Sequence, residues 1–101
     1  MTQAEVKTRT KTNVEIKEPP MFRVIYINDD KTPMEFVIST LIEHFDYTID
    51  SAQDITMAIH ETGSAVVAVL PYELAEQKGV EITVAARSEG YPLQIKLEPQ
   101  T

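Results

Sequence analysis

Apolar residues follow two different periods along this chain, and the first change of period comes near residue 30. Between residues 22 and 27 nearly every position is apolar, which predicts a strand whose two faces are both at least partly covered. A turn follows at Asn28-Asp29-Asp30. Beyond it, apolar residues recur every three or four positions as far as Phe45, which predicts a helix that ends at about residue 46.

The start of this first helix carries a local capping pattern. Thr32 is expected to be the N-cap, because its hydroxyl can accept a hydrogen bond from the first turn. Pro33 then stands at the first helical position, where proline is tolerated. Glu35 completes a Thr-x-x-Glu capping box, so the helix is expected to begin directly after the turn.

A second helix is predicted from a cap at Asp50, with Gln53 at its third position, to a stop at Gly63. The run 64–70 is almost wholly apolar, which is typical of a buried central strand. Near the end of the chain, Leu93, Ile95 and Leu97 alternate with polar residues, which predicts a half-exposed antiparallel strand.

The region after Pro71 gives a mixed pattern. Residues 73–76 favour a helix, but Val80, Ile82 and Val84 are β-branched and alternate as in a strand. The pattern alone therefore divides this region into a short helix and a strand. With one helix here, the order is strand, helix, helix, strand, helix, strand. That order predicts an α+β domain, in which helices cover one face of a small three-stranded antiparallel sheet.

Length and composition indicate one domain with an extension. A chain of 101 residues with 43% hydrophobic residues can build a single small core. Residues 1–20 are rich in Thr, Lys and Glu and end in Pro19-Pro20, so we expect a flexible N-terminal arm. Residues 21–101 are expected to form the core domain.

Charge narrows the classes of partner. The net charge is -7, and residues 21–101 carry five basic and 13 acidic side chains. Nucleic acid and anionic membranes are poor partners for such a domain, whereas a cationic ligand or a basic surface fits. No run approaches the roughly 18 apolar residues of a membrane span, and because residues 1–20 lack the apolar core of a secretory signal, we expect no such signal. The absence of cysteine suits a cytoplasmic location, and a monomer is the simplest expectation.

The turn offers candidate chemistry if the second helix folds back beside the first strand. Asn28, Asp29 and Asp30 would then meet His60, which lies near the end of that helix. Such a cluster offers several acceptors and negative charge, which suit an ammonium group with three N–H donors. A chain's α-amino group, which has a pKa of about 8, is such a group. The alternatives are a turn bonded to its own backbone and a surface histidine.

Catalytic readings have less support. Asp29 and Asp30 are adjacent and tend to point apart, which does not suit paired acid–base work. His44 and His60 lack a recognised metal-ligand spacing, and the chain has no glycine-rich phosphate loop or nucleophile elbow. We therefore expect no enzyme, no metal and no cofactor. A small metal-dependent hydrolase is the third reading.

Three segments of the chain resemble the ClpS family of adaptors for a bacterial protease. They are residues 24–37 (VIYINDDKTPMEFV), residues 58–63 (AIHETG), and residues 72–78 (YELAEQK) together with Tyr91-Pro92-Leu93. The resemblance spans about residues 20–98 without gaps. It implies a non-enzymatic adaptor that binds N-degrons, which are free N-termini beginning with Leu, Phe, Tyr or Trp. It also implies delivery of these substrates to a ClpA- or ClpC-like AAA+ unfoldase and its protease.

The resemblance also implies roles for individual residues. Those expected to hold the α-amino group are Asn28, Asp29, Asp30 and His60. Those expected to form the pocket for the first side chain are Met34, Val37, Thr56, Ile59 and Leu93. Within that pocket, Met34 is expected to disfavour β-branched first residues. Glu73 and Lys78 are expected to contact the unfoldase, and the arm 1–20 is expected to be engaged by it.

The chain departs from the family pattern at two positions. Thr56 stands where the family often has a larger apolar residue, which could widen the pocket or alter the ranking of first residues. Gly79 weakens a third helix that the family builds as one piece, and by resemblance we expect that helix over about residues 72–87. The second reading is an interaction module that resembles the C-terminal domain of the ribosomal stalk protein. Such a module would leave Asn28 and His60 apart or bonded locally.

Overall fold

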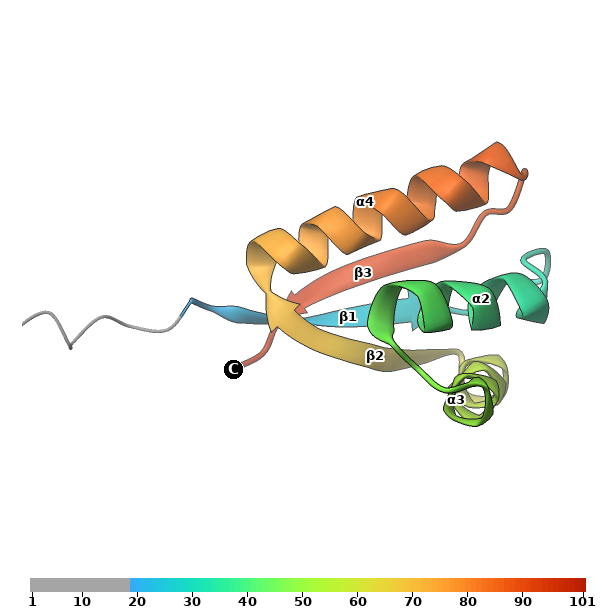
Figure 1. Cartoon of the computed structure of the whole chain (residues 1–101), viewed down its shortest axis with the longest axis horizontal. Helices are drawn as coiled ribbons and strands as arrows, with labels where there is room; N and C mark the ends of the chain where they lie inside the picture. Colours follow the sequence, from blue (N-terminus) through green and yellow to red (C-terminus); the bar gives the residue numbers. More distant parts are fainter. Residues whose placement is uncertain (1–18) are drawn as a thin grey trace, which may run out of the picture.

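The computed structural model describes residues 19–101, which form three helices and a three-stranded antiparallel sheet (Figure 1). The elements in chain order are β1 (Met21–Ile27), α2 (Met34–Phe45), α3 (Ile49–Thr62), β2 (Ser64–Pro71), α4 (Tyr72–Ser88) and β3 (Gln94–Pro99). This order and the antiparallel sheet confirm the α+β prediction. The predicted arm lies almost entirely outside the described residues.

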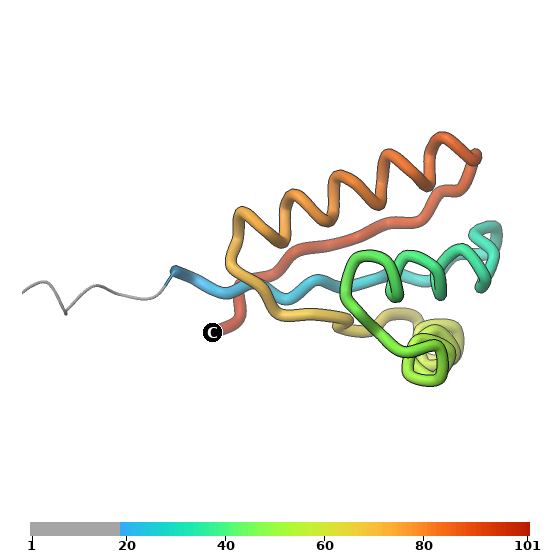
Figure 2. Tube along the Cα trace, in the orientation of Figure 1, coloured from blue at the N-terminus to red at the C-terminus, as the bar shows by residue number. Residues whose placement is uncertain are grey.

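The sheet has the order β2-β1-β3, so β1 is the central strand. The prediction of a central strand at residues 64–70 was therefore wrong, because β2 pairs on one side only and Val66 is 43% exposed. Strand β2 is apolar for another reason, because α3 and α4 both pack against it. Figure 2 shows the chain passing from β2 through α4 to β3 on the other side of β1.

The helices cover one face of the sheet, and the core lies between the two layers (Figure 1). On that face of β1, Val24 and Tyr26 are fully buried. On the other face, Arg23 is partly exposed and pairs with Glu98 of β3 at 3.4 Å. The remaining buried apolar residues are Val37, Leu41, Ala52, Ile59, Val67, Ala75, Ile82, Ala86 and Leu93.

The predicted capping box of α2 does not form. Pro33 is the N-cap, and its carbonyl accepts hydrogen bonds from the backbone N–H groups of Phe36 at 3.1 Å and Val37 at 3.3 Å. The Thr32 hydroxyl instead donates to a carboxylate oxygen of Asp29 at 2.8 Å. The Thr32 side chain therefore bonds to the preceding turn and does not cap α2. The helix ends at Phe45, close to the predicted end.

The N-cap of α3 is Thr48, two residues before the predicted cap at Asp50. The Thr48 hydroxyl accepts from the Ser51 N–H at 3.1 Å, and the Thr48 N–H donates to the Ser51 hydroxyl at 3.1 Å. A serine thus takes the place of the usual glutamate or glutamine in the reciprocal box. At the other end, Gly63 adopts φ 100°, the left-handed conformation expected of a glycine stop.

Helix α4 runs unbroken through Gly79 to Ser88, which confirms the continuous helix and corrects the split. Ile82 is fully buried, whereas Val80 and Val84, one turn apart on the other side, are 56% and 63% exposed. Packing of Ile82 against the sheet outweighs the cost of about 1 kcal/mol for a glycine within a helix. None of the helices within residues 19–101 is long and apolar enough to cross a membrane.

Candidate functional site

A cavity opens where β1 ends, α2 begins and the loop before β3 returns to the sheet. Its empty volume is about 310 Å³ when the solvent at its open mouth is included, and the part that water-sized probes can enter is about 20 Å³. Its lining residues are Tyr26, Ile27, Asn28, Asp29, Thr32, Met34, Val37, Thr56, Ile59, His60 and Leu93. Asn28 and His60 therefore meet at one cavity, whereas Asp30 does not line it.

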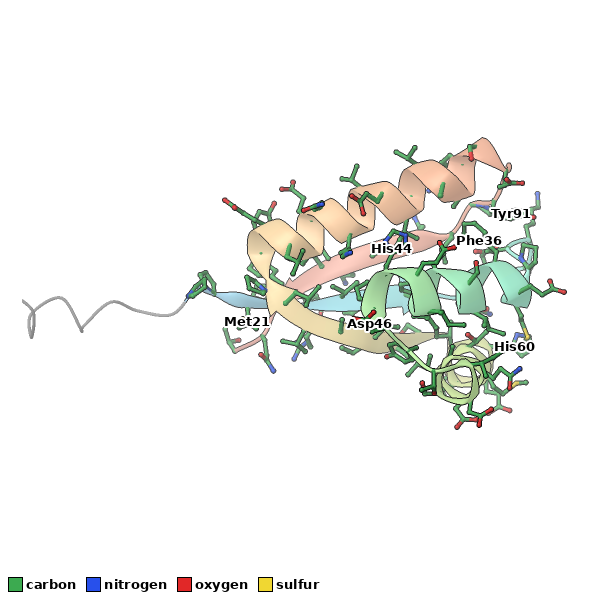
Figure 3. The ribbon with its side chains drawn as sticks, in the orientation of Figure 1. Met21, Phe36, His44, Asp46, His60 and Tyr91 are labelled. Carbon is green, nitrogen blue, oxygen red and sulfur yellow. The ribbon has the colours of Figure 1, made fainter. Side chains whose placement is uncertain are left out.

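The rim of the cavity is polar and exposed. Asn28 directly follows β1. His60, which Figure 3 labels, lies on the last turn of α3. The two elements are joined at this point, because the Asn28 N–H donates to the Gly63 carbonyl at 2.9 Å. That hydrogen bond fixes the end of α3 beside the end of β1. As a result, the side chains of Asn28 and His60 reach the same opening.

Asp29 holds the turn together. One of its carboxylate oxygens accepts from the N–H groups of Lys31 and Thr32, each at 2.7 Å. Partial burial acts to raise the pKa of Asp29, but the hydrogen bonds from Thr32 and Lys31 and the charge of Arg87 lower it overall. Asp29 therefore supplies fixed negative charge at the rim. Its oxygens are also committed to the local backbone, as the turn alternative anticipated.

The floor of the cavity is buried and largely apolar. Val37, Ile59 and Leu93 are at most 7% exposed, and Thr56 is 4% exposed. Met34 is different, because at 38% exposed it lies at the edge of the opening. The cavity thus has acceptors and charge at its mouth and hydrocarbon at its base.

Tyr26 closes the floor from β1, and its hydroxyl is held by Thr40 of α2 at 2.8 Å. The Thr40 hydroxyl donates to the Val37 carbonyl at 2.8 Å, so the Tyr26 hydroxyl is the donor in the first bond. Burial raises the pKa of Tyr26 far above its usual value. The phenol is therefore neutral and serves as a fixed wall.

Arg87 positions the loop that brings Leu93 to the floor. Its guanidinium donates to the carbonyls of Tyr91 and Leu93, each at 2.9 Å. The Tyr91 ring packs edge-on against Phe36 of α2, with centroids 5.1 Å apart, and Figure 3 shows the two side chains together. The loop is thus attached to both α4 and α2, and Leu93 is held in place.

Sequence reasoning missed three lining residues, Tyr26, Ile27 and Thr32. All three flank the Asn-Asp-Asp turn, so proximity to that turn was the available signal. Their contribution depends on how the strand end and the turn face α3, which the local pattern does not specify. No group of three or more His, Cys, Asp or Glu within residues 19–101 is placed to hold a metal ion.

The two residues expected to contact a partner lie away from this cavity. Glu73 is exposed on the first turn of α4, and Lys78 lines a separate depression together with His44 and Leu74. His44 Nδ1 also lies 3.6 Å from a carboxylate oxygen of Glu81 on α4. The chain therefore presents two distinct surfaces, one at the end of β1 and one along α4.

Comparison with known proteins agrees with this arrangement. The family model for the ATP-dependent Clp protease adaptor protein ClpS matches residues 17–96. This chain belongs to the ClpS family. Members of the family are named as adaptor proteins of a protease. The family assignment replaces the ribosomal stalk reading, and the common cavity of Asn28 and His60 is the opposite of what that reading required.

Relatives in the ClpS family match between 82% and 99% of this chain. A ClpS 1 adapter from Bradyrhizobium diazoefficiens is 40% identical over 99% of both chains. A ClpS adapter from Nitratidesulfovibrio vulgaris is 50% identical over 83% of this chain and 84% of its own. The structure of Agrobacterium tumefaciens ClpS2 bound to L-phenylalaninamide is 37% identical, with a TM-score of 0.79. It matches 82% of this chain and 100% of its own.

Proposed function

We propose that this protein binds the free N-terminus of proteins that begin with a large hydrophobic residue and delivers them to a Clp-type AAA+ unfoldase. The adaptor itself performs no catalysis. The observation that carries the proposal is the composition of the cavity, in which Asn28 and His60 stand at the mouth of an apolar floor. One end suits an ammonium group, and the other suits the side chain attached to the same α-carbon.

Recognition of the amine relies on hydrogen bonds at the rim. The Asn28 amide oxygen and a neutral imidazole nitrogen of His60 are acceptors for two N–H donors of the α-ammonium group. The negative charge of Asp29 at the same rim favours the cation, although its oxygens also serve the turn. Asp30 contributes charge from outside the cavity. An internal peptide nitrogen is neutral and carries one hydrogen, so it satisfies the rim poorly.

Recognition of the side chain relies on the floor. Val37, Ile59 and Leu93 offer buried hydrocarbon, which favours Leu, Phe, Tyr and Trp over small or charged residues. Met34 at the edge acts against β-branched first residues by crowding the atoms next to the α-carbon. The solved structure of Agrobacterium tumefaciens ClpS2 supports this division, because L-phenylalaninamide combines a free amine with a benzyl group.

Delivery is proposed to use the second surface. Glu73 and Lys78, which lie on α4 away from the cavity, are proposed to contact a ClpA- or ClpC-like unfoldase while a substrate occupies the cavity. Residues 1–20 are proposed as the segment that the unfoldase engages. We further propose that the protein acts as a monomer in the cytoplasm.

The direct test is fluorescence anisotropy with labelled ten-residue peptides that begin with Phe or Leu. Each peptide is compared with its N-acetylated form and with a peptide that begins with Val. We expect micromolar or tighter binding that acetylation abolishes, and weak binding of the Val peptide. Equal binding of free and acetylated peptides would refute amine recognition, and no binding of any peptide would refute the N-degron site.

A further inference from the structure

One polar side chain on the floor of the cavity has a hydroxyl without a partner. Thr56 is 4% exposed, and its Oγ1 is buried and makes no hydrogen bond within residues 19–101. Threonines inside helices commonly bond to a preceding carbonyl, and Thr62 on the same helix does so to Ala58 at 2.8 Å. Buried hydroxyls without any partner are uncommon in native proteins, so this one requires an explanation.

The rest of the floor does not supply a partner. The Tyr26 hydroxyl is already paired with Thr40, and the neighbours Val37, Ile59 and Leu93 have only apolar side chains. Oγ1 is also closed to water in this structure, so we expect its partner to be a group that enters the cavity and moves the neighbouring side chains apart. The group that reaches the floor is the far end of the first side chain, because the α-amino group is held at the rim.

We propose that Thr56 makes this adaptor selective for a first residue whose side chain ends in a hydrogen-bonding group, so that Tyr is bound more tightly than Phe. The inference rests on the proposed function, since it concerns the first side chain of the same ligand. A tyrosine hydroxyl can both donate and accept, so it can pair with Thr56 whichever way that hydroxyl points. A Phe side chain fills the same space and leaves Oγ1 without a partner.

The expected preference follows from one hydrogen bond between neutral groups. Such a bond contributes about 1 kcal/mol, which corresponds to about fivefold in affinity. Burial of the tyrosine hydroxyl removes it from water, so a pocket that offered it no partner would give the opposite order. Whether the Tyr peptide or the Phe peptide binds more tightly therefore reports on the role of Thr56.

The test uses the full-length protein and three peptides that begin with Tyr, Phe or 4-methylphenylalanine, each with a free and an acetylated N-terminus. The methyl compound matches Tyr in size but cannot form the hydrogen bond. Thr56→Val removes the hydroxyl and keeps the β-branched shape, whereas Thr56→Ser keeps the hydroxyl and loses the methyl group. We expect the unmodified protein and Thr56→Ser to favour Tyr about fivefold over the methyl compound. Thr56→Val is expected to lose that preference and to bind Phe at least as tightly.

Two results would overturn the inference while amine-dependent Phe binding stayed intact. They are equal or weaker binding of Tyr by the unmodified protein, and a Tyr preference that survives in Thr56→Val. Loss of amine-dependent binding for all three peptides would be a failure of the proposed function, and the Thr56 inference would fail with it. Melting temperatures give a separate check that both variants fold. Thr56→Val is expected to melt a few degrees higher, because it no longer buries a hydroxyl without a partner.

Discussion

Asn28 and His60 reach the rim of the cavity from two different elements, and each offers an acceptor that a bound ammonium group would use. Neither residue is buried, so removing either side chain leaves the core unchanged. The effect of a substitution at these positions should therefore appear in binding rather than in folding.

We predict that Asn28→Ala and His60→Ala each weaken binding of a Phe-starting peptide by about 1–3 kcal/mol, or roughly 5- to 150-fold. Anisotropy titrations measure the loss, and unfolding in urea checks that stability is retained. Gln53→Ala is the matched control, because it truncates an exposed amide on α3 that does not line the cavity. Unchanged affinity in both rim variants would contradict their role.

Asp29 makes the stability of the folded protein depend on pH. Because its pKa is lowered in the folded protein, its contribution to stability is present above its usual value of 3.8 and is lost as the pH falls through the lowered value. We predict that Asp29→Asn destabilises the protein at neutral pH, and that its deficit shrinks below about pH 4. Urea unfolding from neutral to strongly acidic pH measures this deficit, with Asp30→Asn as the control for removing one carboxylate from the turn. A deficit that stayed constant with pH would rule out this account.

At the scale of elements, the ends of helices decide where the site residues stand. Helix α3 begins at Ile49, and its N-cap Thr48 forms a two-sided capping box with Ser51. We predict that Thr48→Ala lowers the free energy of unfolding by about 1 kcal/mol. Asp50→Asn should cost only about 0.3 kcal/mol, because it removes a charge near the helix N-terminus but no cap. Denaturant midpoints compare the two variants, and a larger loss at Asp50 would mean that the cap lies there instead.

The loop between α4 and β3 depends on Arg87, which holds the carbonyls of Tyr91 and Leu93. We predict that Arg87→Ala weakens peptide binding about fivefold, because Leu93 is no longer fixed at the floor. Arg23→Ala is the charge-matched control, since Arg23 lies on the opposite face of the sheet and pairs with Glu98. Equal effects of the two variants would indicate that only the total charge matters.

At the scale of the whole molecule, the cavity and the exposed part of α4 are separate surfaces of one small domain. An adaptor needs such a separation, because substrate and unfoldase must be bound at the same time. Binding and delivery can therefore be tested independently.

We predict that Glu73→Ala combined with Lys78→Ala slows degradation of a Phe-starting reporter by a Clp unfoldase and its protease by roughly tenfold, as expected for contacts central to an interface. Peptide affinity measured by anisotropy should stay the same. Asn28→Ala is the converse control, because it should impair both readouts. Normal delivery by the double variant would place the partner contact elsewhere.

Local patterns in the sequence were sufficient for the identity of most elements. Helical spacing up to Phe45 and the glycine stop at Gly63 are effects of neighbouring residues, and both agree with the structure. Competition between local patterns was harder to judge. Thr32 could cap α2 or bond to Asp29, and the choice depends on the shape of the turn. The β-branched run after Gly79 was also ambiguous until packing of Ile82 against the sheet settled it.

The sequence by itself determined the fold class, the family resemblance and the types of chemistry available, because these depend on residue identity and short-range spacing. Only the tertiary structure decided that β1 is central, that Asn28 and His60 share a cavity, and that Thr56 lies on its floor with a hydroxyl that has no partner among residues 19–101. Strand order and the meeting of distant side chains depend on long-range packing of α3 and α4 over the sheet. No local period encodes that packing.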